Sequence, residues 1–181
     1  MFNLDKIYKA LFFAVKAHEG QKMKQPSNVD YTAHIFGVAL TAINYIEKEN
    51  VDKSLVVIVA LLHDVLEDTS VSYDEIKNVF GIDVANGVMA LTKNENLPYE
   101  DQMEDSLNRI INLNKKEIAI VKLADRCFNT RCKVENWSTE RQIEYYIEAK
   151  KICDKIGFYC APLQNKILEN IANWKIEEVI L

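Results

Sequence analysis

The ionisable side chains between residues 63 and 68 are the part of this sequence most able to do chemistry. One imidazole and three carboxylates follow an apolar run that ends at Leu62; they are His63, Asp64, Glu67 and Asp68. In a continuous helix, Glu67 would lie one turn from His63, and Asp68 one turn from Asp64. Carboxylates are costly to bury without partners, so this cluster indicates either a bound cation or a reaction site.

Two residues elsewhere in the chain would complete a metal site. His34 follows Asp30-Tyr31-Thr32-Ala33, and Asp125 follows the apolar residues 121–124. Together with His63 and Asp64 they offer two imidazole nitrogens and two carboxylates, which suits Mn²⁺, Fe²⁺ or Zn²⁺ with water in the remaining positions. Such a metal lowers the pKa of its bound water and polarises a phosphoryl oxygen. Glu67 and Asp68 would then be free to accept the proton of that water.

Each of these residues also has a structural interpretation. A His-Asp pair is frequent by chance, and most such pairs are surface residues or helix caps. Asp125 is next to Arg126 and would also suit an ion pair within one helix. His18, in Ala17-His18-Glu19-Gly20, is more typical of a helix C-cap or of a residue that supports the ligands than of a ligand itself.

The composition predicts a single helical domain over residues 1–181. It is 49% hydrophobic with only five glycines and three prolines, which favours helices over a turn-rich β fold. The net charge of −5 argues against general binding to nucleic acid or to an anionic membrane. Basic residues nevertheless concentrate in one stretch. This stretch could form a basic wall that binds a small polyanion, or it could be a solvated helix face. Its basic residues are Lys115, Lys116, Lys122, Arg126, Arg131 and Lys133.

The cysteines and the apolar runs indicate a cytoplasmic protein. No Cys-x-x-Cys pair occurs, so Cys127, Cys132, Cys153 and Cys160 are expected to be reduced thiols. The N-terminal residues do not resemble a secretory signal, since only five apolar residues follow the first charges. The longest apolar run, Leu55–Leu62, is far short of the ~20 residues that span a bilayer. We therefore expect a soluble protein with no membrane partner, and its oligomeric state stays open.

Helical periodicity and helix-end signals recur along the chain. Apolar residues repeat with a helical period over residues 4–14 and 35–46. Ser72-Tyr73-Asp74-Glu75 is a capping-box pattern, Gly81 is a helix terminator, Ser138 is a helix cap, and Pro162 is placed to open a last helix. A long irregular loop is expected from about His18 to Tyr31, and such loops are often functional.

The β-branched segment Val56–Val59 is the one local signal that favours a strand. No other segment offers it a partner, and an isolated strand cannot satisfy its backbone hydrogen bonds. We therefore expect a fully buried central helix here. The chain as a whole is predicted to be an all-α bundle of roughly eight to ten helices.

Three ordered segments resemble the HD-type hydrolase domain of the RelA/SpoT family, which degrades the alarmone (p)ppGpp. They are residues 17–34, residues 60–69 and residues 121–131, and the second is similar to the family's ALLHDVVEDT almost letter for letter. The spacing from Lys24 to His34, together with Trp137-Ser138, Arg141 and Tyr145, resembles the small single-domain alarmone hydrolases of that family. The resemblance extends over roughly residues 4–151.

The resemblance implies a fold, a reaction and a role for individual residues. It implies an HD-domain helical bundle that hydrolyses the 3′-pyrophosphate of guanosine tetra- or pentaphosphate, giving GDP or GTP and pyrophosphate. It places the metal, typically Mn²⁺, on His34, His63, Asp64 and Asp125. It makes Glu67 and Asp68 the pair that activates the attacking water. It assigns contacts with the nucleotide and its phosphates to Lys24, Asn129, Arg141 and Tyr145. Arg126 is expected to offset further phosphate charge.

The chain departs from the family pattern where the purine is expected to bind. Met23 stands where the family usually has an arginine that stacks on the base, and Cys127-Phe128 replaces the usual Leu-His pair. Methionine packs against a ring but offers neither a hydrogen bond nor a cation–π contact. One alternative is therefore an HD phosphohydrolase acting on another nucleotide with a ribose 2′- or 3′-phosphate. Another is a non-catalytic sensor that binds the alarmone.

Overall fold

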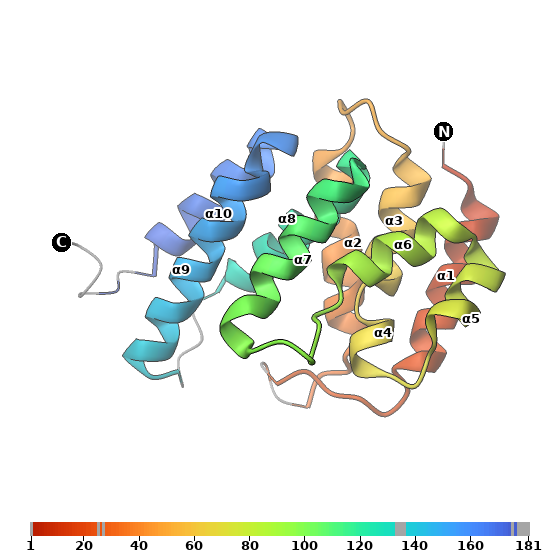
Figure 1. The fold of residues 1–181 in the computed structure, drawn as a ribbon, viewed down its shortest axis with the longest axis horizontal. Coiled ribbons are helices and arrows are strands. Elements are labelled where there is room, and N and C mark those ends of the chain that lie inside the picture. Colours follow the sequence, from red (N-terminus) through yellow and green to blue (C-terminus); the bar gives the residue numbers. More distant parts are fainter. Residues whose placement is uncertain (1, 25, 27, 133–136, 175, 177–181) are drawn as a thin grey trace.

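The computed structural model describes residues 2–24, 26, 28–132, 137–174 and 176, and the regular elements in this part of the chain are helices joined by loops (Figure 1). Its ten α-helices and one 3₁₀ helix are α1 (Leu4–Ala17), α2 (Thr32–Tyr45), α3 (Lys53–Leu62), α4 (Val65–Asp68), α5 (Tyr73–Phe80), α6 (Ile82–Leu91), α7 (Tyr99–Leu113), α8 (Lys116–Thr130), α9 (Thr139–Ile156), η1 (Gly157–Tyr159) and α10 (Ala161–Ala172). The described residues contain no β-strand, only an isolated bridge between Lys22 and Asp30. The predicted all-α fold is confirmed.

Helix α3 lies at the centre of the fold. Every residue from Leu55 to Leu62 is buried, and the helix packs against α1, α2, α6 and α8. It begins at Asp52, whose carboxylate accepts hydrogen bonds from the backbone N–H groups of Ser54 and Leu55. The β-branched segment is thus helical as predicted, because a helix satisfies its backbone without a neighbouring strand.

The predicted helix-end signals also act where the sequence places them. Ser72 and Glu75 form a reciprocal capping box at the start of α5, and Gly81 ends that helix with a positive φ of 96°. The Ser138 hydroxyl accepts from the N–H of Arg141 at the start of α9. Pro162 lies in the first turn of α10.

The chain between residues 60 and 68 is not one continuous helix, so the helical geometry considered above holds for Asp64 and Asp68 but not across His63. Helix α3 ends at Leu62, and α4 begins at Val65 after a turn made by His63 and Asp64. The Asp64 carbonyl then accepts from the N–H groups of Glu67 and Asp68, at 3.1 and 2.8 Å. In a straight helix adjacent side chains diverge by 100°, whereas this turn directs those of His63 and Asp64 to one point.

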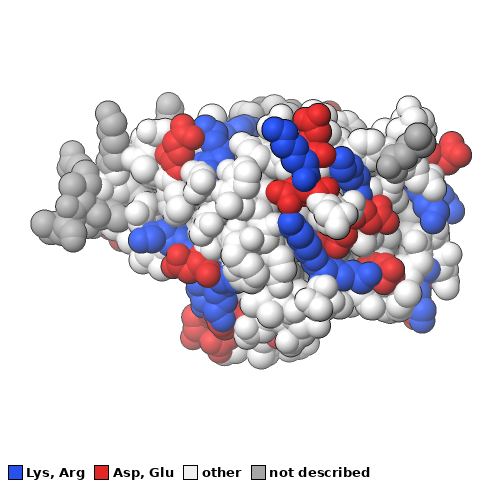
Figure 2. Space-filling view, turned by 90° about the horizontal axis from the view of Figure 1, so that it is seen from above, with Lys and Arg blue, Asp and Glu red and all other residues white. Residues whose placement is uncertain are grey.

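The helices form a row in Figure 1, with α1 and α5 at one end and α9 and α10 at the other. Helices α2, α3 and α8, which contact one another, lie between these ends. The loop between α1 and α2 runs along one side of the row, near α4. On the opposite side, Figure 2 shows basic and acidic side chains mixed over the surface, often as neighbours.

Two further expectations concern the cysteines and membrane insertion. All four cysteines are free, with Cys127, Cys153 and Cys160 buried and Cys132 exposed, as predicted. Over the residues that the structure describes, no helix combines the length and the apolar character needed to cross a bilayer.

Candidate active site

A cavity of ≈ 1010 Å³ opens between the α1–α2 loop, the α3–α4 turn and helices α8 and α9. All ten residues predicted to act in the site line this cavity. They are Lys24, His34, His63, Asp64, Glu67, Asp68, Asp125, Asn129, Arg141 and Tyr145. The structure therefore brings together residues that are far apart in the sequence, and the inner and outer parts of the cavity differ in character.

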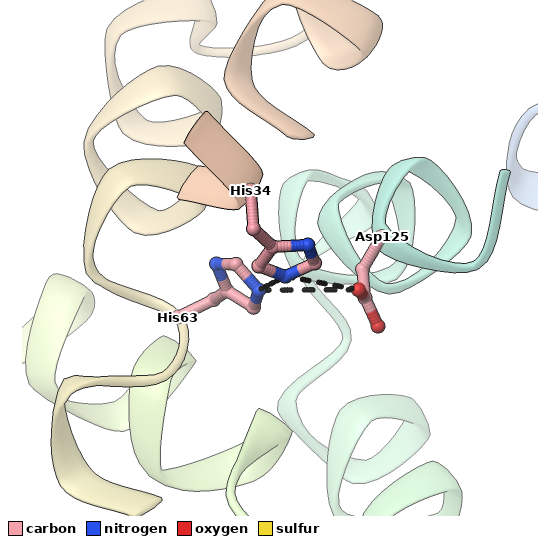
Figure 3. A group of neighbouring side chains, drawn as sticks. All are labelled: His34, His63 and Asp125. Carbon is pink, nitrogen blue, oxygen red and sulfur yellow. Dashed lines mark hydrogen bonds and ion pairs between the residues drawn. The ribbon is translucent and has the colours of Figure 1, made fainter. Parts of the chain in front are cut away.

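Two imidazoles and two carboxylates meet at the inner end of the cavity. The Nε2 atoms of His34 and His63 are 3.2 Å apart, and Asp125 Oδ1 lies 3.6 Å from the first and 4.0 Å from the second (Figure 3). Asp64 Oδ2 lies 3.0 Å from His63 Nε2 and 3.4 Å from His34 Nε2. Both histidines are buried. The donor atoms of His34, His63 and Asp125 thus lie within 4.8 Å of one another, and Asp64 contacts both histidines.

Neighbouring hydrogen bonds orient these ligand atoms. His63 Nδ1 is 2.8 Å from the Ala60 carbonyl oxygen, which can only accept, so Nδ1 carries the proton and donates. This leaves Nε2 facing the other ligand atoms. Asn129, one turn after Asp125 on α8, donates from Nδ2 to Asp125 Oδ1 at 2.6 Å. Asp125 and Asn129 therefore share one face of α8.

The electrostatics of this group favour a positive charge at its centre. Burial lowers the pKa of His63, but the carboxylates of Asp64 and Asp125 outweigh burial and raise it to about 9. Burial likewise raises the pKa of Asp64, but the two histidines hold it well below its usual range. The Asp64 carboxylate thus retains its negative charge, which favours a cation beside it. With neutral imidazoles, the nitrogens of His34 and His63 and the Asp125 carboxylate fit a divalent first-row metal, and Asp64 adds a second carboxylate beside both imidazoles.

Glu67 and Asp68 lie beside this group, each held by a residue from another segment. Glu67 Oε2 accepts from the backbone N–H of Lys93 at 3.0 Å, and Oε1 lies 3.5 Å from the Lys93 ammonium. The hydroxyl of Tyr31 donates to Asp64 Oδ2 at 2.5 Å and lies 3.2 Å from Asp68 Oδ2. Burial, followed by the charge of Asp64, raises the pKa of Asp68.

Neither Tyr31 nor Lys93 is predicted from the sequence to act in the site. Tyr31 precedes Asp64 by 33 residues, and Lys93 follows Glu67 by 26, so no local pattern pairs them. The available signal for Lys93 was its position in the polar stretch that follows the apolar residues of α6.

Aromatic and basic side chains line the outer part of the cavity. Arg141 Nη1 donates hydrogen bonds to the Tyr99 hydroxyl at 3.2 Å and to the Glu144 carboxylate at 3.1 Å. The ring of Tyr145 is stacked on that of Trp174, with centroids 5.8 Å apart and 14° between the planes. Trp174 is itself fixed, because its Nε1–H donates to the Thr130 carbonyl at 3.1 Å. This wall therefore combines π surfaces with a cation.

The basic stretch of α8 proves to be divided between two regions. Lys115 and Lys116 form ion pairs with Asp83 and Glu49, at 3.2 and 2.5 Å, outside the cavity. Lys122, Arg126 and Arg131 line the cavity instead, and Lys133 lies outside the described residues. Neither a continuous basic wall nor a solvated face describes the whole stretch.

Two of the structural alternatives are now resolved. Arg126 pairs with Glu148 on α9, and not with Asp125 as an intrahelical pair would require. His18 is the C-cap residue of α1, as the alternative for that residue predicted. Its Nδ1 is 2.7 Å from Gln21 Oε1, and its ring packs on Tyr31 with centroids 5.0 Å apart.

Comparisons with known proteins agree with this geometry. The HD domain family matches residues 10–156. The guanosine-3′,5′-bis(diphosphate) 3′-pyrophosphohydrolase MESH1 of Danio rerio is 31% identical over 159 residues, covering 86% of each chain. The same-named protein of Drosophila melanogaster is 32% identical over 170 residues, covering 91% of this chain and 92% of its own. A solved structure of a metazoan orthologue of SpoT that hydrolyses ppGpp superposes with a TM-score of 0.83 at 26% identity, covering 97% and 99%.

Proposed function

This chain belongs to the HD-domain family, in the group of the MESH1 proteins, and from that membership we propose that it hydrolyses the 3′-pyrophosphate of guanosine 3′,5′-bis(diphosphate) or the pentaphosphate. The products are GDP or GTP and pyrophosphate. We further propose that residues 1–181 act as one metal-dependent catalytic domain on this small molecule in the cytoplasm. The observation that carries the proposal is the convergence, in one cavity, of the four ligand atoms, the Glu67/Asp68 pair and several cationic side chains.

His34, His63, Asp64 and Asp125 are the residues that would hold the metal, and Mn²⁺ is our choice because of the resemblance to the RelA/SpoT family. A bound divalent metal supplies acidity to a water ligand and polarises a phosphoryl oxygen. Two hydrogen bonds orient the proposed ligands. The Ala60 carbonyl fixes the tautomer of His63, and Asn129 fixes the orientation of the Asp125 carboxylate.

The proposed reaction is the displacement of the ribose 3′ oxygen by water. A bond forms between the water oxygen and the phosphorus attached to O3′, and the bond from that phosphorus to O3′ breaks. Glu67 or Asp68 takes the proton that the water loses, and O3′ leaves with a proton as the 3′-hydroxyl. Lys93 and Tyr31 hold these two carboxylates in place beside the ligand atoms.

The remaining cavity residues are suited to hold the nucleotide. Lys24 and Arg141 bring positive charge to the polyphosphate, and Asn129 retains hydrogen-bonding capacity beside Asp125. Tyr145 lines the cavity wall, with its ring stacked on Trp174 and the Arg126 guanidinium 4.1 Å from the ring centroid. These roles rest on position in the cavity and on the match to the family motif.

A second candidate is the hydrolysis of another nucleotide with a ribose 2′- or 3′-phosphate. Met23 favours this second candidate, because it lines the cavity where the base is expected to bind. The backbone N–H of Met23 donates to the Val29 carbonyl at 2.8 Å, and this hydrogen bond fixes Met23 within the α1–α2 loop. A thioether there does not select a base by hydrogen bonding. Rates measured with matched guanosine and adenosine substrates separate the candidates. A preference for guanosine of tenfold or more supports the first, and equal rates support the second.

The decisive experiment replaces the proposed proton acceptors. In the Glu67→Gln/Asp68→Asn double variant, turnover of guanosine tetraphosphate by the Mn²⁺-loaded protein should fall about 10²–10⁴-fold. Nucleotide affinity should stay within about tenfold, ~1.4 kcal/mol. Glu19→Gln is the matched control, since Glu19 is exposed and outside the cavity. Undiminished turnover in the double variant refutes the mechanism, and binding without turnover by the wild type identifies a sensor.

A further inference from the structure

Lys122 is a buried cation in the cavity for which the reaction described above has no use. It lies on α8, one turn before Asp125, and lines the cavity while only 7% of the residue is exposed. Its ammonium makes no hydrogen bond or ion pair with any residue in the described part of the chain. Burying an unpaired charge is costly, and burial lowers the pKa of this lysine.

The anions around Lys122 have other partners. Glu148 pairs with the guanidinium of Arg126, and Glu67 pairs with Lys93. Asp125 faces the two histidines and accepts from Asn129. Lys93 and Arg126 add positive charge close enough to oppose the charge of Lys122. Lys122 therefore has no partner of its own among the described residues, and Nε and Nη1 of the neighbouring Arg126 also lack a hydrogen-bond partner there.

We infer that Lys122 binds the terminal phosphoryl group of the substrate's 3′-pyrophosphate, with Arg126 as a fixed neighbouring charge. This subsite rests on the proposed function, because the phosphorus that is attacked is placed beside Asp125. The second phosphoryl group is joined to that phosphorus through one oxygen. Three residues of α8, a rise of about 4.5 Å, separate the two positions along the helix. An anion bound there pairs the lysine and compensates its desolvation.

This subsite would allow the cavity to distinguish a ribose 3′-pyrophosphate from a ribose 3′-monophosphate. A ribose 3′-monophosphate places its phosphoryl group beside Asp125 but leaves Lys122 unpaired, whereas a 3′-pyrophosphate reaches both. A buried group left unpaired by the wrong ligand is a strong source of discrimination. Lys122 is thus expected to favour pyrophosphorylated substrates over monophosphorylated ones.

The test measures binding of inorganic pyrophosphate to metal-free protein by titration calorimetry, so that turnover is not needed. Lys122→Met and Lys122→Gln remove the charge, and Lys116→Met on the same helix is the matched control outside the cavity. We expect the Kd for pyrophosphate to rise at least tenfold in both Lys122 variants and less than twofold in the control. The melting temperature of Lys122→Met should equal or exceed that of the wild type, since an unpaired buried charge is gone.

Three results overturn the subsite: no measurable pyrophosphate binding by the wild type, an unchanged Kd in both Lys122 variants, or an equal loss in the control. These outcomes are distinct from failure of the proposed function. A wild type that binds pyrophosphate through Lys122 but leaves guanosine tetraphosphate intact keeps the subsite and refutes the reaction.

Discussion

The hydroxyl of Tyr31 joins the proposed metal ligands to the proposed proton acceptors. It donates to Asp64 at 2.5 Å, and its oxygen lies 3.2 Å from the carboxylate of Asp68. Burial, followed by the charge of Asp64, raises the pKa of Tyr31, so the phenol stays neutral and keeps its proton at pH 7. One rigid aromatic side chain therefore sets the relative position of two carboxylates with different roles.

Replacing Tyr31 with phenylalanine should separate this positioning effect from packing. The ring is kept, but both carboxylates lose the hydroxyl, and we expect a 10–100-fold loss in kcat or in Mn²⁺ affinity with little change in KM. Steady-state kinetics and metal titration provide the measurement. Tyr45→Phe is the control, because Tyr45 ends the same helix and its hydroxyl makes no hydrogen bond among the described residues. Values within twofold of this control would contradict the role.

At the residue scale, the sequence grouped the proposed metal ligands and the pairs that lie close along one helix, but it missed the residues that hold Glu67 and Asp68. Asn129 and Asp125 are four residues apart on α8, so helical geometry alone pairs them. The partners of Glu67 and Asp68 come from other segments, and only tertiary packing brings Lys93 and Tyr31 to them. Lys122 was placed in a basic stretch, but its burial depended on how α8 packs.

At the scale of the elements, the helical periodicity of the apolar residues and the residue types that mark helix ends predicted most of the helices. Ser72, Gly81, Ser138 and Pro162 each act at the helix end where the sequence places them. The turn between α3 and α4 could not be predicted in this way, because residues 60–68 contain neither glycine nor proline to break a helix. The pairing of His63 and Asp64 with His34 is a tertiary feature that no local propensity reports.

Two N-cap serines allow the role of α9 to be tested. Ser72→Ala and Ser138→Ala should each lower the free energy of unfolding by about 1 kcal/mol, because each removes a side-chain acceptor at a helix start. Of the two helices that these serines cap, only α9 carries cavity residues, among them Arg141 and Tyr145. Ser138→Ala should therefore also raise KM, while Ser72→Ala should leave it unchanged. Urea unfolding and steady-state kinetics measure both effects, and equal KM values for the two variants would show that the start of α9 does not position these residues.

At the scale of the whole molecule, the proposed metal site lies where the helices at the centre of the row meet. Helices α2 and α8 and the end of α3 supply the ligand atoms, and these helices also contact one another directly. Their arrangement in space did not follow from periodicity, which reports one helix at a time. It was the resemblance of three separated segments to one family that predicted their meeting.

Metal should consequently stabilise the entire fold. A ligand that binds only the native state at 100 times its Kd adds about 2.7 kcal/mol, and for a chain of this size each kcal/mol raises the melting temperature by about 2–4 °C. Thermal unfolding with Mn²⁺ and with chelator should show this difference in the wild type. The His34→Ala variant should lose most of it. An equal shift in both proteins would place the stabilising metal elsewhere.

The contact between Tyr145 and Trp174 has a consequence for the newly made chain. All four proposed metal ligands precede residue 126, whereas the tryptophan that stacks on Tyr145 comes 49 residues after Asp125. At ribosomal rates of about 5–20 residues per second, roughly 2–10 s separate these two events. A nascent chain can thus bind the metal ion before the contact between Tyr145 and Trp174 has formed in the cavity wall. Synthesis itself would order the assembly of the enzyme, with the ion first and the substrate last.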